Sequence, residues 1–269
     1  MPKNTAHHAR RTAAAVAATA ALGLTLTAVT PAAAAAPPAA APPAAAPPAA
    51  APELPDPAAY ADCPTRLPAG ADPAQWRCEI TVARGSITLG GVKPAEIKPI
   101  TLVHAEGPLP GGDWDQVFGG LRADATPVPG GLLGLPGTGG PGPLPGLSVQ
   151  PEYGGYADFL GTGTDKGGLA LKFRLVSPLL NRRCSIGTDR DPVVLHLSRA
   201  GDSRWLSQDP PLVAFDAYDH TLTAPAATGC GPLGAALNHR FALPAPSGVS
   251  RIDYTAHYTF RSYDQLRAS

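Results

Sequence analysis

The sequence has no net charge and few aromatic residues. The first property argues against binding to nucleic acid or anionic lipid, and the second argues against an aromatic binding surface. Basic and acidic residues both number 21, and aromatic residues make up 6% of the chain. Domains that bind nucleic acid normally carry a basic patch, so nucleic acid is not expected as a partner, and neither is an anionic lipid surface. The core needs most of the few aromatic residues, which leaves little for an aromatic binding surface.

Several sequence motifs that are typical of metal sites and hydrolase active sites are also missing. The four cysteines form no CxxC-type pair, which argues against a structural zinc site. The chain has no G-x-S-x-G nucleophile elbow. Gly201-Asp202-Ser203 follows a predicted strand as the nucleophile block of GDS-type esterases does, but no histidine stands three residues after an aspartate. We interpret this tripeptide as a turn.

Residues 1–36 are predicted to be a secretory signal peptide. Lys3, Arg10 and Arg11 precede an uncharged apolar run at 12–30, and small residues in A-x-A form follow. Without these three basic residues, 18 basic and 21 acidic residues remain, a net charge of about −3. We expect the mature chain to begin between residues 33 and 40 with no transmembrane segment. The alternative is that the apolar run stays as an anchor.

Two segments have the composition of linkers. Residues 37–60 are rich in proline and alanine and are predicted to be a semi-rigid linker. At 127–147, 14 of 21 residues are glycine or proline and none is charged, which predicts a mobile insertion, with an apolar contact surface as the alternative. We expect both segments to be dispensable for folding. An LPxTG match at 135–139 lies in mid-chain, where a cell-wall sorting signal does not work.

The segment at 169–197 is the centre of the predicted domain, which spans 61–269. Apolar residues alternate with more polar ones from Leu169 to Leu175, as in a half-buried strand, and Ser177-Pro178 ends the alternation. A second, more apolar strand follows at 193–197. Similar patterns predict further strands at 78–82, 86–89, 99–105, 116–121, 204–207, 212–218 and 251–260.

One short helix is predicted after Gly231-Pro232, because Leu233, Leu237 and Phe241 fall on one helical face. Many short strands with abundant turn residues indicate an all-β domain. The predicted fold is a β-sandwich or a partly open β-barrel with one short helix and two disulfides.

Two blocks of sequence resemble a known family. The first contains Ser177-Pro178-Leu179-Leu180, Cys184-Ser185-Ile186-Gly187 and Asp191-Pro192, and the second contains residues 224–231 with Leu243-Pro244. Over about residues 175–250 the chain resembles a family of uncharacterised secreted actinobacterial proteins. The resemblance implies export and a disulfide between the cysteines of the two blocks, and it implies no activity. The chain departs from the family at 199–205, where members have a Thr/Gly-rich run.

All four cysteines lie after the predicted signal, so we expect two disulfides. Four cysteines allow three pairings. The resemblance favours Cys184 with Cys230. Cys63 with Cys78 is the pairing expected at the other end, since it ties the segment before the first strand to the sheet.

No residue is assigned a catalytic, cofactor-binding or metal-binding role. His104 with Glu106, and Asp253 with His257, each share a strand face and are candidates for a base with its orienting carboxylate. His104 also shares its face with Ile100, which favours a packed histidine.

Two further groups were weighed as binding sites. Asp165, Asp189 and Asp191 offer oxygen ligands for calcium, although acids in a turn usually cap it. Five aromatic residues are candidates for a sugar-stacking platform: Trp76, Trp114, Trp205, Tyr153 and Tyr156.

The sequence therefore predicts an exported, non-catalytic structural or binding domain that acts at the cell envelope or outside the cell. No cofactor is expected, and the partner is unassigned, with an envelope glycan or protein as candidates. The alternatives are a secreted hydrolase and a glycan-binding module.

Overall fold

The computed structural model describes residues 54–94, 96–135 and 146–268, which belong to one compact unit from Ala50 to Ser269. The predicted signal peptide and most of the predicted linker lie outside the described residues, as do positions 136–139 of the LPxTG match. No helix in the described part is long and apolar enough to cross a membrane.

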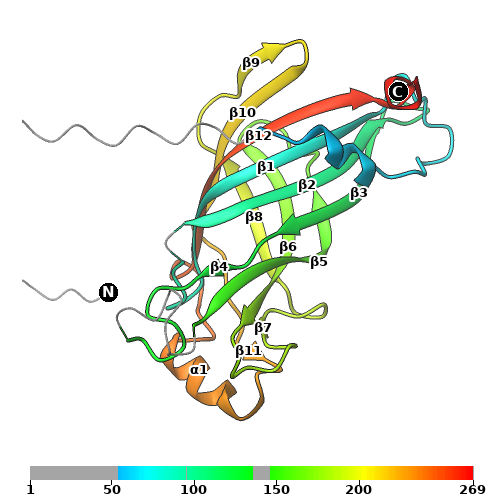
Figure 1. The fold of residues 1–269 in the computed structure, drawn as a ribbon. Coiled ribbons are helices and arrows are strands. Elements are labelled where there is room, and N and C mark those ends of the chain that lie inside the picture. Colours follow the sequence, from blue (N-terminus) through cyan, green and yellow to red (C-terminus); the bar gives the residue numbers. More distant parts are fainter. Residues whose placement is uncertain (1–53, 95, 136–145, 269) are drawn as a thin grey trace, which may run out of the picture. The chain divides into compact units, whose positions relative to one another are not determined.

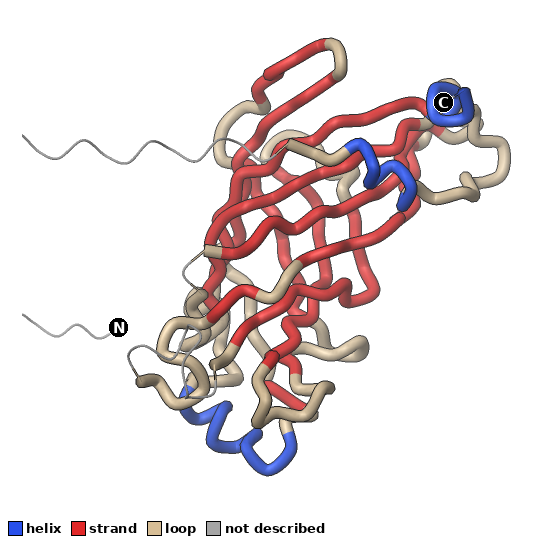
Figure 2. Tube along the Cα trace, in the orientation of Figure 1, coloured by secondary structure: helices blue, strands red, loops and turns tan. Residues whose placement is uncertain are grey.

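Strands dominate the described residues, and short helices lie at the ends of the sheet (Figures 1 and 2). The first half of the strands comprises β1 (Arg77–Thr88), β2 (Ile97–Pro108), β3 (Trp114–Ala123), β4 (Thr126–Pro127), β5 (Ser148–Asp158) and β6 (Asp165–Val176). The second half comprises β7 (Ser185–Ile186), β8 (Val193–Arg199), β9 (Arg204–Gln208), β10 (Pro211–Asp219), β11 (Ala227–Thr228) and β12 (Arg251–Ser262). The helices are η1 (Pro57–Asp62), η2 (Gly231–Leu233), α1 (Gly234–Arg240) and α2 (Tyr263–Ala268).

All strand pairs are antiparallel and belong to one curled sheet with the order β11-β7-β6-β8-β10-β12-β1-β2-β3. In addition, β5 pairs with β6 and β4, and β9 pairs with β10. The predicted fold class is confirmed, with the partly open barrel rather than the sandwich as its form. The predicted helix is α1, and the structure adds α2, which the sequence analysis missed together with β4, β5, β7 and β11.

Side chains rather than a backbone ladder join β3 to β5, where the curled sheet meets itself. The Gln116 side chain donates to the Ala157 carbonyl at 2.6 Å and accepts from the Phe159 amide at 2.9 Å. Gln150 donates to the Ala123 carbonyl at 2.6 Å. Between the two glutamines, the rings of Phe118 and Tyr153 stack with centroids 3.8 Å apart. We call this boundary the glutamine seam; it holds the sheet in its curled form.

The central strands pack as their sequence pattern predicts. On β6, Leu169, Leu171, Phe173 and Leu175 are buried in the main core cluster, where Val193, Leu195 and Leu197 of β8 join them. β6 ends at Val176, immediately before Ser177-Pro178. This alternation places one face of each strand inside the curl of the sheet.

β1 is buried on both faces. Its even-numbered residues Cys78 and Ile80 pack outside the curl in a second cluster with Trp76 and with Tyr263 of α2. The Trp76 indole donates to the Pro108 carbonyl at 2.9 Å. The Cys63–Cys78 disulfide ties the end of η1 to this outer face. The outer cluster thereby shields β1 and β2 from solvent on the side away from the curl.

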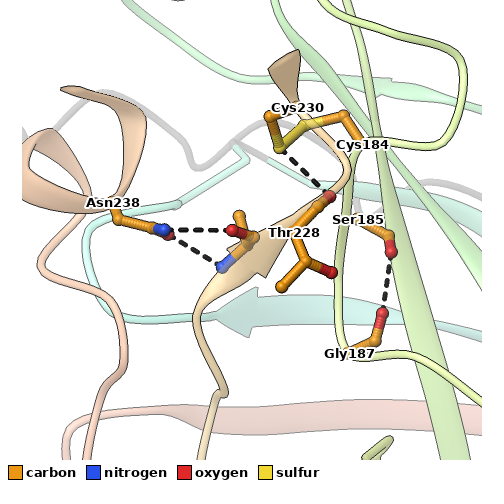
Figure 3. Close-up of a disulfide and its surroundings, with 7 residues drawn as sticks. Cys184, Ser185, Gly187, Thr228, Cys230 and Asn238 are labelled. Atoms are coloured by element: carbon orange, nitrogen blue, oxygen red, sulfur yellow. Dashed lines mark hydrogen bonds between the residues drawn. A yellow bond between two sulfur atoms is a disulfide. The ribbon is translucent and has the colours of Figure 1, made fainter. Parts of the chain in front are cut away.

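The Cys184–Cys230 disulfide fastens the opposite end of the sheet, near α1, β7 and β11 (Figures 1 and 3). Asn238 of α1 bonds both backbone groups of Ala227, accepting at 2.8 Å and donating at 3.0 Å. The disulfide links the loop after β6 to the residue before η2. Both predicted disulfide pairings are confirmed.

The ends of the predicted insertion at 127–147 belong to the core. Val128, Leu132 and Leu147 are buried in the main cluster, and the Val128 amide donates to the Leu147 carbonyl at 2.8 Å. The expectation that the whole segment is mobile and dispensable is therefore wrong for its described parts. A high glycine and proline content does not prevent individual leucines from packing at fixed positions.

Leu147→Ala should lower the free energy of unfolding by about 2–5 kcal/mol, because truncating a buried leucine removes apolar contacts and leaves a cavity. Leu133→Ala is the matched control in the same segment, since Leu133 is 53% exposed and should change stability by less than about 0.5 kcal/mol. Urea denaturation of both variants measures the difference. Equal effects would show that the segment does not pack.

Candidate functional site

A cavity of about 160 Å³ lies inside the curl of the sheet. One part of its wall is apolar, with side chains from β2, β6, β8, β10 and β12; these include Ile100, Leu102, Leu169, Leu171, Leu195, Leu197, Phe215 and Ile252. The polar part comes mainly from β1 and β2, with Lys166 from β6. The cavity is therefore amphipathic.

The register of β1 against β2 brings four ionisable side chains together. Arg77 stands opposite Glu106, and Glu79 stands opposite His104. The residues are two apart on each strand, so all four project from the same face, which is the face toward the cavity. We call these four residues the polar cluster.

Arg77 and Glu106 form the ion pair of the polar cluster. The Arg77 Nε donates to Glu106 Oε1 at 2.9 Å, and Nη2 bonds the same oxygen. The guanidinium also lies over the Phe260 ring, 4.7 Å from its centroid. Burial opposes ionisation of Glu106, but contact with His104 and the charge of Arg77 outweigh it and lower the pKa of this carboxyl. Glu106 is therefore held as a carboxylate.

His104 is only 3% exposed and has unmet hydrogen-bonding capacity. Its Nε2 lies 3.5 Å from Glu106 Oε2, longer than an ordinary N–H···O hydrogen bond. Its Nδ1 is buried and has no hydrogen-bond partner among the described residues. One side of the ring packs against Phe159 at a centroid distance of 5.0 Å. A buried polar atom without a partner is costly, so it marks a place where a ligand would be stabilising.

Glu79 is the other buried group with weak partners. Its Oε1 accepts from the Thr81 hydroxyl at 3.2 Å, and its Oε2 lies 3.8 Å from Arg77 Nη2. Burial raises the pKa of the Glu79 carboxyl, and the nearby His104 and Arg77 only partly oppose this effect. Burial likewise lowers the pKa of Lys166, whose ammonium lies 5.1 Å from the Phe215 ring centroid. The cavity thus disfavours unpaired charge.

No family model, curated protein or solved structure matches this chain. The resemblance to secreted actinobacterial proteins stays a prediction from the sequence. Function is therefore inferred from the geometry of the site.

Of the two candidate base and carboxylate pairs, the structure brings only one together. His104 and Glu106 are adjacent inside the cavity, and His104 is packed as expected. Asp253 instead bonds His220, with 2.7 Å between Oδ1 and Nε2, and both side chains are about half exposed. His257 lies near Arg204 and Asp216, with its pKa lowered mainly by burial and then by Arg204.

Two of the candidate calcium ligands, Asp165 and Asp189, serve local structure. Asp189 pairs with Lys172 at 2.7 Å, and Asp165 accepts from the Gly167 amide at 2.7 Å. Among the described residues, one group of histidine and carboxylate side chains is close enough to share a metal ion, and it contains Glu79, His104 and Glu106 instead.

Trp76 cannot belong to the candidate aromatic platform, because it is fully buried in the outer cluster. Trp114, Tyr156 and Trp205 are about half exposed on three different strands, β3, β5 and β9. Tyr153 stacks on Phe118 in the glutamine seam. This distribution gives the glycan-binding alternative little support.

Sequence analysis missed Arg77 and Glu79. The predicted strand at 78–82 begins one residue after Arg77, and its alternation gives Glu79 no distinctive signal. The signal that identifies them is their offset from His104 and Glu106 by the β1–β2 register, which the sequence alone does not give.

Arg77→Met should lower the free energy of unfolding by about 2–3 kcal/mol, because it leaves the Glu106 carboxylate buried without its ion partner. Lys98→Met is the control, since Lys98 and Asp124 form an exposed pair at 4.0 Å that should contribute less than about 1 kcal/mol. Denaturant titration at neutral pH compares the two. A loss no larger for Arg77→Met than for Lys98→Met would contradict this account of the pair.

Proposed function

We propose that the protein is an exported binding domain for a small, mostly apolar molecule with one polar head. Export is supported by the predicted signal peptide and by two disulfides, which persist in oxidising compartments. The body of the ligand would lie against the leucines of β6 and β8, and its head would meet the polar cluster.

The observation that carries this proposal is the unpartnered Nδ1 of His104 inside a largely apolar cavity. A domain that used the inside of the sheet only as a core would gain stability from apolar residues at these positions, because burying charged groups costs more than burying hydrocarbon. A pocket with apolar walls and a few convergent polar groups is typical of small-molecule binding sites.

The cavity volume limits the ligand. A cavity of about 150 Å³ lined by apolar side chains accommodates one benzene-sized molecule. The cavity here is of that size, about 160 Å³, so the ligand class is a small ring or a short branched chain. An oligosaccharide or a long acyl chain exceeds this volume and would have to extend out of the cavity.

A hydrolase is the second candidate, and the contact between His104 and Glu106 is the observation that favours it. A hydrolase of the serine type also needs a nucleophile beside the histidine. Among the described residues, Thr81 is the only one that brings an aliphatic hydroxyl to the cavity wall, and it donates to Glu79. Binding is therefore the better supported function.

Phenol and toluene test the proposal because they match in size and differ in one hydroxyl. Both should raise the melting temperature of the exported protein, and phenol should bind more tightly because its hydroxyl meets the polar cluster. Calorimetric titration gives the two affinities. A free phenol concentration of 100 times the dissociation constant stabilises the folded protein by about 2.7 kcal/mol, and a thermal melt detects a change of this size.

A pair of leucine variants on β6 locates the binding. Leu171 lines the cavity, whereas Leu175 is equally buried and does not. Leu171→Phe should fill the cavity and weaken phenol binding with little loss of stability. Leu175→Phe should overpack the core at a cost of about 1–3 kcal/mol and leave binding by the folded protein unchanged. Binding of neither probe, or equal effects of the two variants on phenol affinity, would contradict the proposal.

A further inference from the structure

We propose that Glu79, His104 and Glu106 form a binding site for a divalent transition-metal ion, with Zn²⁺ as the expected metal. One ligand atom from each of the three residues lies within 4.8 Å of the other two, and all three residues are buried. The register of β1 and β2 fixes their positions, so the site is built on two rigid strands rather than on a loop.

The spacing of one ligand pair matches that of two ligands on a shared ion, and the third ligand atom lies within 4.8 Å of both. Two ligands that each bind a tetrahedral zinc ion at ~2.1 Å lie roughly 3.4 Å apart. His104 Nε2 and Glu106 Oε2 are separated by 3.5 Å, too far for an ordinary hydrogen bond and close to this ligand–ligand distance. Glu79 lies directly across the strand pair from His104 and supplies the third atom.

The ligand atoms are available for coordination. Arg77 bonds Glu106 only through Oε1, which leaves Oε2 toward His104. Neither ring nitrogen of His104 makes a hydrogen bond of ordinary length, because Nδ1 has no partner and Nε2 has only the 3.5 Å contact. Glu79 has one long hydrogen bond, from Thr81. Arg77 would remain on Glu106 and orient it, as the outer partners of metal ligands commonly do.

The chemistry of the three ligands selects the class of metal. The two carboxylates supply negative charge that attracts a divalent ion, and Arg77 offsets part of it. Calcium and magnesium prefer sites made only of oxygen atoms and larger coordination numbers, so the imidazole argues against them. One imidazole with two carboxylates suits Zn²⁺ and its first-row neighbours. Three protein ligands leave a fourth position of a tetrahedral zinc ion for water or a ligand atom.

This inference shares the cavity with the proposed function but does not depend on small-molecule binding. It rests on the polar cluster alone. Phenol binding without zinc binding would remove the metal site and leave the proposed function intact. Zinc binding without phenol or toluene binding would contradict the proposed function and leave the metal site intact.

The test uses the exported protein without an affinity tag, treated with a chelator and then dialysed. Equilibrium dialysis against zinc chloride should give one bound ion per chain, and calcium or magnesium chloride should give none. Glu79→Gln and His104→Gln should each weaken zinc binding by roughly 10-fold or more. His220→Gln is the matched control, because His220 and Asp253 form an exposed histidine and carboxylate pair at 2.7 Å. This variant should bind zinc as the parent does.

Cobalt provides a readout that does not depend on the stability of the variants. Co²⁺ bound by the parent protein in place of zinc should show the strong visible absorption of a four- or five-coordinate ion, rather than the weak absorption of the hydrated ion. Absence of stoichiometric zinc binding by the folded parent would overturn the proposal. So would equal zinc affinity in the parent, Glu79→Gln and His104→Gln, or a cobalt spectrum identical to that of the hydrated ion.

Discussion

The structure depends on the pairing of β1 with β2, which separates an apolar outer face from a polar inner face. Trp76, Cys78, Ile80 and Tyr263 pack on the outside, and the polar cluster projects inward. Burying Glu79, His104 and Glu106 beside the half-buried Arg77 is costly, and apolar burial contributes about 25 cal/mol per Å². The fully buried Trp76 and its neighbours therefore supply stability that offsets the cost of the polar cluster. The Cys63–Cys78 disulfide adds to this by holding η1 on the outer face.

The glutamine seam explains why the curled sheet can enclose a cavity within its main core. A twelve-stranded sheet that stayed open would expose one face to solvent. A barrel closed by a backbone ladder between β3 and β5 would have no boundary formed by side chains. Gln116 and Gln150 satisfy backbone groups across the seam without a ladder. Phe159, which follows β5 and is held by Gln116, packs against the His104 ring. The seam thus positions one wall of the site.

The sequence predicted the strands in which one face is buried and the other is not, because apolar and polar residues then alternate along the chain. β6, β8, β10 and β12 alternate clearly, and both disulfide pairings followed from the placement of the cysteines and from the family resemblance. β5 was missed because Pro151 and Gly154 interrupt its alternation. Proline is tolerated in this strand, which borders the seam.

The site was not assigned from the sequence, and only two of its four residues were among the candidates, for a physical reason. His104 and Glu106 were recognised as a pair, but Arg77 and Glu79 occupy alternate positions of a strand whose other face is apolar. Such a pattern normally describes a strand with one solvent face, and only the tertiary closure of the sheet buries it. The packed leucines at 132 and 147 were missed for a related reason, since glycine and proline content reports local backbone preference and not tertiary contact.

The central claim is that the inside of the curled sheet is a binding cavity with a polar end. The most direct measurement is a methyl NMR titration of leucine-labelled protein with phenol. The account predicts that the methyl signals of Leu171 and Leu195, which line the cavity, shift together and saturate, while those of Leu175 stay nearly unchanged. Absence of saturable shifts, or shifts confined to exposed leucines such as Leu133 and Leu206, would contradict it.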